Sequence, residues 1–296
     1  MAQFEWGLIG FGEVGSTFAC HIGKRLRRAV FVFDPLLNSK AIPTSVRKRL
    51  EETPVNIVRD IACLAGRCNA VISVVTPRVA SSVARQAARK WGKGLFIDFN
   101  SVSPSEKRSL AGFFPGGTYV DGAILGSVTL DGAAVPLAIA GPRAGRAAAS
   151  FRKIGLTVKV AEPRVGMASA LKMCRSIFMK GLECLFVETL LAAAEFGLEK
   201  SVLKSIEQTF QSYGFQRMVQ MLVTTHAIHC GRRSDEMRSA ARMMRQIGVP
   251  IHMTKASRNL LGASSEAGLS KHFDGEVPDA FGPVISYLKD TYGRMQ

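Results

Sequence analysis

The stretch that decides the fold lies near the amino terminus, 4-FEWGLIGFGEVG-15. Its first half, residues 4–9, is a short apolar run that predicts a β-strand. A G-x-G-x-x-G turn follows, and a helical pattern then continues through Ala19, Ile22 and Leu26. The order of strand, glycine turn and helix predicts the first unit of an α/β sheet.

The spacing of this glycine turn suits a dinucleotide. Gly10 permits a tight turn, Gly12 lets the backbone approach a pyrophosphate, and Gly15 lets the helix pack on the strand. The N–H groups at the start of the helix carry a partial positive charge that favours phosphate. We therefore expect a nucleotide to contact the whole turn, namely Gly10, Phe11, Gly12, Glu13, Val14 and Gly15.

The next apolar run, residues 29–33, ends in Asp34. In dinucleotide-binding folds an acid at the tip of the second strand binds the adenosine ribose hydroxyls and repels a 2′-phosphate. NAD is therefore favoured, whereas Lys40, a few residues on, could reach a phosphate and keeps NADP possible. The alternative for Asp34 is a turn residue at the strand end before Pro35.

Further strand-like runs follow at the spacing of α/β proteins. They span residues 55–57, 70–75, 95–99, 118–120 and 137–140, with helical candidates between them at 80–90 and 104–113. The alternation predicts an N-terminal, Rossmann-type, doubly wound and mostly parallel sheet. We assign residues 1–162 to a dinucleotide-binding domain.

Small or polar residues follow three of these predicted strands. Because ligands of such sheets bind beyond the carboxyl ends of the strands, we expect these residues to line the cleft. They are Thr76 and Pro77 after one strand, Asn100, Ser101 and Ser103 after the next, and Gly126 and Ser127 after the third.

After Ala161 the sequence becomes helical. Residues 166–197, GMASALKMCRSIFMKGLECLFVETLLAAAEFG, contain no proline and are apolar over most of a helical circumference, which predicts a long helix buried on nearly all sides. Further helices are predicted at 200–213, 216–230, 235–247 and 285–292. We expect residues 163–296 to form an all-helical domain for substrate binding and dimerisation.

Lys172 stands near the start of the long helix, with Ser176 and Lys180 following on nearly the same face. An amine in so apolar a setting costs free energy unless something uses or pairs it, so Lys172 is the candidate catalytic group. The alternatives are a lysine that extends its ammonium to water and, for Ser176, a plain packing serine.

Four motifs together resemble the β-hydroxyacid dehydrogenase superfamily, which includes 3-hydroxyisobutyrate and 6-phosphogluconate dehydrogenases. They are the glycine turn, D-x-N-S-x-S-P at 98–104, Y-V-D-G-A-x-x-G-S at 119–127, and G-x-x-x-x-x-K at 166–172. The segments ASALKMCRS and HCGRRSDEM resemble a subgroup with a 6-phosphogluconate-dehydrogenase-like C-terminal helical domain of poorly assigned function.

The resemblance implies a role for each matching residue. Lys172 would be the general acid/base, and Asn100, Ser101 and Ser103 would contact nicotinamide and substrate. The family's S-G-G turn, which holds the substrate carboxylate, corresponds to residues 125–127.

Two departures from the family leave the substrate open. The turn at 125–127 begins with leucine, so that Gly126 and Ser127 remain to bind a carboxylate. The family's asparagine one turn after the lysine is Ser176, and Arg175 beside it could bind an anion.

The cluster H-x-x-H-C at 226–230 has the spacing of neighbours on a helix and could hold zinc with His226 and His229. No further ligand set is evident, so we expect no metal. His229, Arg232 or Arg233 could instead line the substrate end of the cleft, or cap a helix.

Composition bounds the partners. The net charge of +16 comes mostly from residues before Ala161, but its basic runs lack interleaved aromatics and match no groove-reading motif. The start of the chain has no signal-peptide pattern, and no apolar run is long enough for a bilayer. The six cysteines show no CxxC pair. We expect a cytoplasmic protein with reduced, mostly buried thiols that binds neither nucleic acid nor membrane.

The sequence thus predicts an NAD(P)-dependent enzyme that moves a hydride between the cofactor and the alcohol carbon of a small anionic β-hydroxyacid, as a homodimer or higher homo-oligomer. The alternatives are a decarboxylating sugar-acid dehydrogenase, an imine reductase of the same fold, and a dinucleotide-sensing protein without activity. Lys172 disfavours an imine reductase, and the altered turn at 125–127 disfavours a strict 6-phosphogluconate enzyme. The sequence does not specify which hydroxyacid is used.

Overall fold

The computed structural model describes residues 4–39 and 41–294, so Lys40, the residue that could reach a 2′-phosphate, lies outside the described residues. The chain divides into two compact units, Met1–Ile177 and Phe178–Gln296. The division falls within the long helix α8 (Met167–Ala194), and Lys172 therefore belongs to the first unit.

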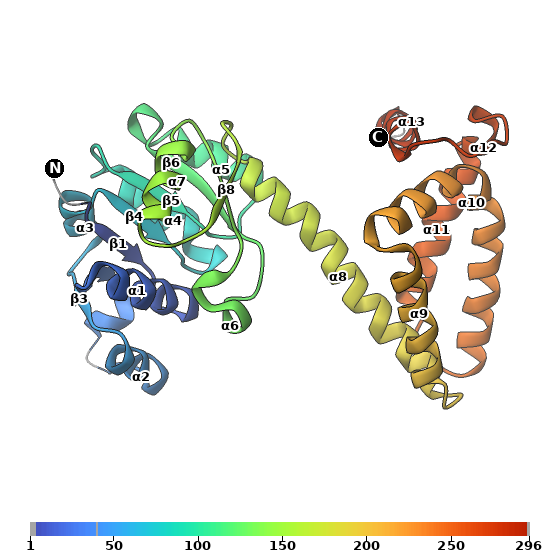
Figure 1. Ribbon diagram of the computed structural model, residues 1–296, viewed down its shortest axis with the longest axis horizontal. Helices are drawn as coiled ribbons and strands as arrows, with labels where there is room; N and C mark the ends of the chain where they lie inside the picture. Colours follow the sequence, from blue (N-terminus) through green and yellow to red (C-terminus); the bar gives the residue numbers. More distant parts are fainter. Residues whose placement is uncertain (1–3, 40, 295–296) are drawn as a thin grey trace. The chain divides into compact units, whose positions relative to one another are not determined.

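The first unit is built on one sheet, in which eight strands are found among the described residues (Figure 1). Its strand order is β3-β2-β1-β4-β5-β6-β7-β8, and every neighbouring pair is parallel except β6 and β7. The doubly wound, mostly parallel fold is confirmed. The strands are β1 (Trp6–Ile9), β2 (Val30–Phe33), β3 (Val55–Ile57), β4 (Ala70–Ser73), β5 (Leu95–Asp98), β6 (Tyr119–Ile124), β7 (Leu137–Ala140) and β8 (Val158–Glu162).

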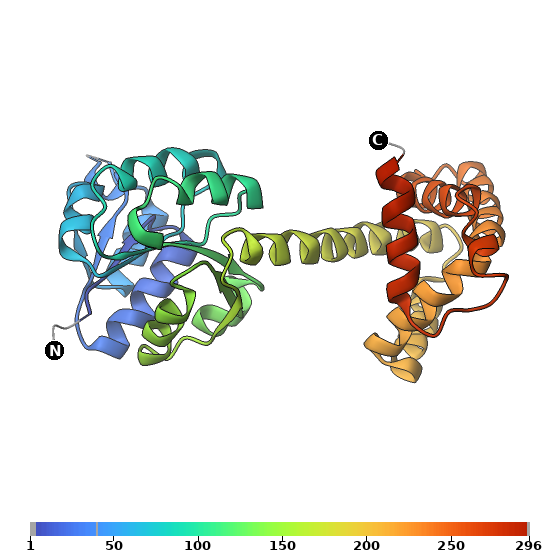
Figure 2. The same ribbon diagram turned by 90° about the horizontal axis from the view of Figure 1, so that it is seen from above.

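Helices cover both faces of the sheet (Figures 1 and 2). Successive strand residues point to opposite faces, so Leu8 packs in the cluster that contains Phe18 of α1, and Ile9 packs in the cluster that contains Leu64 of α3. One face carries α1 (Glu13–Leu26), α2 (Thr44–Glu52) and α7 (Ala144–Lys153), and the other carries α3 (Ile61–Arg67), α4 (Pro77–Ala88) and α5 (Pro104–Ala111). Shorter turns of helix are η1 (Pro35–Asn38), η2 (Pro115–Gly117), α6 (Val128–Asp131) and η3 (Gly132–Ala134).

Strand β8 was not predicted from the sequence. Its residues, VKVAE, are half-buried or exposed, and among the described residues β8 stands at the end of the sheet and pairs with β7 alone. The strand therefore lacks the apolar run that marks the other strands in the sequence, although it pairs with β7 in parallel.

The second unit contains the later part of α8 and helices α9 (Glu199–Tyr213), α10 (Phe215–Gln246), α11 (His252–Glu266), α12 (Leu269–His272) and α13 (Phe281–Arg294). The prediction of separate helices at 216–230 and 235–247 is wrong, because α10 is continuous through Gly231. A Cβ at Gly231 would lie 2.9 Å from Oγ of Ser265 on α11, so this glycine allows two helices to cross closely. Helix α11 was not predicted at all.

The long helix α8 exposes much of its apolar surface in the single chain, including Ile177, which is 76% exposed, and Val187 and Leu191. Burial of this surface against another subunit stays a prediction. The expectation of mostly buried thiols is wrong. Of the six cysteines, which are all free, Cys68 and Cys230 are buried, two are exposed and two are half-buried.

Candidate functional site

The three glycines of the first turn meet different surroundings. Gly10 has a φ of +99°, and a Cβ there would lie 2.4 Å from the carbonyl oxygen of Val74. A Cβ on Gly15 would lie 2.0 Å from the carbonyl oxygen of Gly10. A Cβ on Gly12 would meet nothing within 4 Å. The protein's own packing therefore requires Gly10 and Gly15, whereas at Gly12 the backbone faces open space.

The start of α1 fits the pyrophosphate of a dinucleotide. The N-cap residue is Gly12, which offers no side-chain hydrogen bond to the first turn, so N–H groups remain for an anion. The Phe11 side chain is 1% exposed and belongs to the core, so its backbone alone faces the turn. Glu13 is exposed and Val14 is half-buried.

Asp34 lies at the end of β2 and closes onto the glycine turn. Its Oδ2 accepts a hydrogen bond of 2.7 Å from the N–H of Phe11, and its Oδ1 accepts one of 2.9 Å from the N–H of Leu36. Asp34 thus caps η1 and ties the glycine turn to β2. Each carboxylate oxygen keeps a further lone pair that could accept a hydrogen bond from a ribose hydroxyl. That contact stays a prediction.

The ends of β4 and β5 are joined by Asn100. Its Oδ1 accepts a hydrogen bond of 2.7 Å from the N–H of Val75, and its Nδ2 donates one of 2.9 Å to Oγ of Ser73. Asn100 is buried, whereas Thr76 and Pro77 at the start of α4 are exposed. The amide therefore ties the end of β4, which leads to these exposed residues, to the end of β5.

Lys172 and Ser101 meet directly. The amine Nζ of Lys172 donates a hydrogen bond of 2.7 Å to Oγ of Ser101, which follows β5. Lys172 is half-buried and Ser101 is exposed. Two residues that are 71 positions apart in the sequence thus place an amine and a hydroxyl together beyond the carboxyl end of the sheet.

Ser103 and the turn at 126–127 are placed by local structure. Ser103 caps α5, because its Oγ accepts a hydrogen bond of 3.1 Å from the N–H of Glu106. A Cβ on Gly126 would lie 2.9 Å from a carboxylate oxygen of Asp131, and Ser127 is exposed at the start of α6.

The turn at 126–127 and the glycine turn are linked. Oγ1 of Thr129, on α6, donates a hydrogen bond of 2.5 Å to Oε1 of Glu13. The structure therefore brings the turn that was predicted to hold a carboxylate close to the turn that was predicted to hold a pyrophosphate.

The remaining predicted substrate residues lie on two helices. Arg175 is exposed and Ser176 is half-buried, both on α8 within the first unit. His229 is half-buried on α10 in the second unit. Nearby on α10, burial lowers the pKa of His226, and the charge of Arg233 lowers it further.

The sequence search missed a buried polar cluster at the ends of β5 and β6, which we call the β5–β6 cluster. Lys107 is fully buried, and its Nζ lies 2.9 Å from Oδ1 of Asp98 and 3.7 Å from Oδ1 of Asp121. The hydroxyl of Tyr119 donates a hydrogen bond of 2.6 Å to Oδ2 of Asp98. Burial raises the pKa of Tyr119, and Asp98 raises it further, so this hydroxyl stays protonated. An aspartate near the end of each of two adjacent predicted strands was the available signal.

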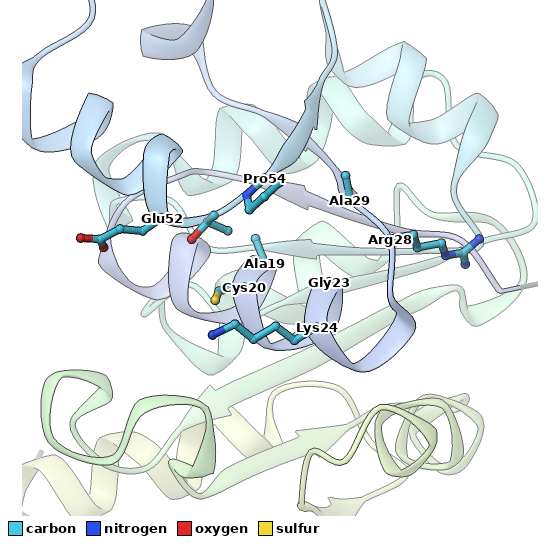
Figure 3. Close-up of a pocket in the computed structure, with 9 residues that line it drawn as sticks. Ala19, Cys20, Gly23, Lys24, Arg28, Ala29, Glu52 and Pro54 are labelled. Atoms are coloured by element: carbon cyan, nitrogen blue, oxygen red, sulfur yellow. The ribbon is translucent and has the colours of Figure 1, made fainter.

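A separate hollow lies beside the second half of α1 (Figure 3). It measures about 280 Å³ and includes Ala29 and Pro54, which precede β2 and β3. This hollow therefore adjoins the amino ends of the strands, whereas ligands of such sheets bind at the carboxyl ends. It is distinct from the candidate site.

Membrane-spanning helices and metal-ligand clusters are both absent from the part of the chain that the structure describes. Within residues 4–39 and 41–294, no helix combines the length and the apolar character needed to cross a membrane. Over the same part of the chain, no group of three or more histidine, cysteine, aspartate or glutamate residues could hold a metal ion.

The strand order, the glycine turn and the helical second half define a Rossmann-type oxidoreductase fold of the 3-hydroxyacid dehydrogenase-like class. Two solved structures show this fold at low sequence identity. An imine reductase from Myxococcus stipitatus in complex with NAD+ is 15% identical, with a TM-score of 0.72, and the match covers 97% of this chain and 99% of that one. A reductive aminase from Aspergillus terreus in complex with NADPH and ethyl-5-oxohexanoate is 13% identical, with a TM-score of 0.71, over 97% and 100% of the two chains.

Closer relatives define the family. A conserved hypothetical protein from Sinorhizobium meliloti 1021 is 30% identical over 97% of this chain and 96% of its own, with a TM-score of 0.59. A conserved protein of unknown function, described as structurally similar to 3-hydroxyacid dehydrogenases, is 32% identical over 90% and 98% of the two chains, also with a TM-score of 0.59. Residues 193–263 match a domain of unknown function, DUF1932. The chain belongs to the 3-hydroxyacid dehydrogenase-like family that carries this C-terminal domain, as the motifs predicted.

Proposed function

We propose that this protein is an NAD(P)-dependent dehydrogenase of small β-hydroxyacids in which Lys172 is the general acid/base. The observation that carries the proposal is the 2.7 Å hydrogen bond between Nζ of Lys172 and Oγ of Ser101. It holds an amine from α8 at the carboxyl end of β5, in the sheet that also carries the glycine turn.

The chemistry follows from these groups. When bound, the nicotinamide supplies the hydride acceptor or donor. As a neutral amine, Lys172 accepts the proton of the substrate hydroxyl at Nζ while the carbon loses its hydride, and in the reverse direction it returns that proton. Ser101 orients the amine and can contact the same hydroxyl.

The glycine turn would hold the cofactor's pyrophosphate, because the backbone at Gly12 is open and the start of α1 offers N–H groups. Asp34 would bind the ribose hydroxyls, which favours NAD over NADP. Thr76, Pro77 and Asn100 complete the proposed cofactor site. Residues 1–162 are thus the proposed dinucleotide-binding domain.

The substrate's carboxylate would bind at the turn of Gly126 and Ser127, which lies near the glycine turn through the hydrogen bond between Thr129 and Glu13. Arg175 follows Lys172 by three residues on α8, and its positive charge suits an anionic substrate. Other proposed substrate contacts are Ser103 and Ser176. His229 stays a candidate residue of the proposed helical substrate and dimerisation domain at 163–296.

The test is a panel of β-hydroxyacids, including hydroxyisobutyrate, serine-like and aryl-substituted acids, assayed with NAD and NADP side by side. Reduction of the nicotinamide, followed by its absorbance, is the expected result with at least one acid, and NAD should give the higher kcat/KM. Tight NADH binding without oxidation of any acid would contradict the proposal and favour a dinucleotide-sensing protein. Reduction of a cyclic imine, with no turnover of hydroxyacids, would favour an imine reductase.

We also propose a homodimer. The exposed apolar side chains of α8, among them Ile177 and Val187, would be covered in it. Sedimentation equilibrium should give twice the mass of the chain, which is 32.0 kDa. A single-chain mass at micromolar concentration would contradict the dimer.

A further inference from the structure

The β5–β6 cluster buries three charged side chains for which the proposed chemistry has no use. Asp98, Lys107 and Asp121 are each 0% exposed. In the sheet Asp98 is the direct neighbour of Asp121, and the amine of Lys107 lies within ion-pair distance of both carboxylates. None of the three can touch a substrate, so their effect on the site must pass through other residues.

Asp121 holds the start of α8. Its Oδ2 accepts hydrogen bonds from the N–H groups of Gly166, at 3.0 Å, and Ser169, at 3.1 Å. Its Oδ1 accepts a third, of 2.6 Å, from Oγ of Ser169. Since Lys172 lies three residues further along the same helix, Asp121 fixes the backbone from which the amine extends.

Asp98 holds the other partner of the proposed catalytic contact. Its Oδ1 accepts a hydrogen bond of 2.8 Å from the N–H of Asn100, and its carbonyl oxygen accepts one of 2.5 Å from Nζ of Lys107. Ser101 directly follows Asn100 in the chain. Lys107 therefore connects two carboxylates. That of Asp98 fixes the backbone before Ser101, and that of Asp121 fixes the backbone before Lys172.

Such a cluster is a poor way to gain stability alone. Removing carboxylates and an ammonium from water costs several kcal/mol per ion, and well-packed apolar side chains often serve a fold as well. Charge-assisted hydrogen bonds do, however, fix geometry. A shift of about 1 Å in a reacting group can cost roughly 10²-fold in rate.

We propose that Asp121, Lys107 and Asp98 are positioning residues that set the distance between the amine of Lys172 and the hydroxyl of Ser101, and so the rate of proton transfer. The inference rests on the proposed function of Lys172. It assigns the cluster to the turnover step and not to the binding of cofactor or substrate.

The test compares two variants that each delete one hydroxyl donor to a buried carboxylate at a helix start. Ser169→Ala removes the 2.6 Å hydrogen bond to Asp121, and Thr254→Val removes the 2.6 Å hydrogen bond to Glu188 in the second unit. In both, the backbone N–H groups still bind the carboxylate. Asp121→Asn is the stronger form of the first change, whereas Ser169→Ala leaves the two N–H hydrogen bonds to Asp121 in place and so disturbs the fold less.

Two readouts are used. The first is kcat, KM and the pH of half-maximal kcat with the best substrate of the panel. Ser169→Ala should lower kcat about tenfold, change KM less than about twofold and shift that pH, whereas Thr254→Val should leave all three unchanged. The second is the rate at which N-acetoxysuccinimide acylates Lys172, measured by peptide mass spectrometry against Lys180. That ratio should rise about threefold in Ser169→Ala alone, because an amine held less firmly at Ser101 reacts more freely.

The second readout needs no turnover, so it separates the two proposals. If the wild-type protein oxidises no hydroxyacid, the proposed function fails, and the acylation ratio still decides whether the cluster positions Lys172. If Ser169→Ala and Thr254→Val lower the Tm alike while the acylation ratio stays at its wild-type value, the cluster is structural and the positioning proposal is wrong.

Discussion

Each of the two units contains a buried carboxylate that holds the start of a helix. Asp121 accepts two N–H groups and one hydroxyl from Gly166 and Ser169 at the start of α8. Glu188 accepts two N–H groups at the start of α11, each at 2.7 Å, and the hydroxyl of Thr254 at 2.6 Å. Each carboxylate therefore receives the same set of donors, two backbone N–H groups and one hydroxyl.

Their surroundings differ. Asp121 shares the amine of Lys107 with Asp98, and the segments that these carboxylates fix lead to Lys172 and Ser101. The hydroxyl bound to Glu188 also lies 3.3 Å from the sulfur of Met244, a packing residue. A carboxylate at a helix start thus serves the fold in both units, and we infer that only in the first does it also serve a reaction.

The largest effect is expected from the loss of the Lys172 amine, which the contact at Asp121 is proposed to position. Lys172→Ala should lower kcat by roughly 10²–10⁴-fold, because the general acid/base is lost, while the affinity for NADH, measured by fluorescence titration, stays unchanged. Lys180→Ala, on the same helix but exposed, is the control and should retain wild-type kcat. Near-normal turnover of Lys172→Ala would mean that Lys172 is not the general acid/base, and that the contact at Asp121 supports no catalytic group.

A pair of alanine substitutions separates the fold from the ligand within the glycine turn. Gly15→Ala should destabilise the protein by about 3 kcal/mol or more, because its Cβ would lie 2.0 Å from a carbonyl oxygen. Gly12→Ala should leave the free energy of unfolding in urea nearly unchanged, since its Cβ would meet no atom of the protein. It should weaken NADH binding by about tenfold, because that Cβ would lie where the pyrophosphate is proposed to bind. Equal NADH affinity in wild type and Gly12→Ala would argue against a pyrophosphate at this turn.

Glu188 should matter for stability and not for turnover. Glu188→Gln should cost about 1–3 kcal/mol, measured by urea unfolding, because a neutral amide cannot accept all three hydrogen bonds. Burial alone would raise the pKa of Glu188, but the hydrogen bonds from Thr254 and Met253 outweigh it and lower the pKa. A carboxylate with a lowered pKa stabilises the fold above its unfolded pKa, near 4.3, and this contribution is lost as the pH falls through the lower, folded value. Wild type and Glu188→Gln should therefore approach each other in stability toward pH 3, and a gap that is constant with pH would contradict this account.

The smallest effect concerns His226 in the second unit. Because its pKa is lowered in the folded state, the unfolded chain takes up a proton first as the pH falls below about 6.5, and the fold loses stability there. His226→Gln lacks this loss, so it should gain on the wild type between pH 8 and pH 5 in thermal unfolding. An opposite trend would mean that the folded state favours the charged imidazole.

What could be predicted from the sequence was local. The glycine turn, Asp34 at a strand end and Lys172 near the start of a helix each lie within a short motif whose chemistry is readable on its own. Their combination with the strand ends at 98–104 and 119–127 was enough for the fold and the family.

What could not be predicted depends on residues far apart in the chain. Asp121 meets Ser169 across 48 positions, and nothing in either segment alone indicates the contact. Gly231 looked like a helix end because its neighbour, Ser265 on α11, is not visible in the local sequence. The apolar composition of α8 predicts that its surface is covered, but it does not say whether the same chain or another subunit covers it.

The most direct measurement is a crystal structure of the protein with NADH. The account predicts that the pyrophosphate lies on the backbone of Gly12, and that the nicotinamide lies near enough to Lys172 and Ser101 for one substrate alcohol to contact the ring carbon and the amine together. A nicotinamide bound away from Lys172, or a cofactor held elsewhere than the glycine turn, would contradict it.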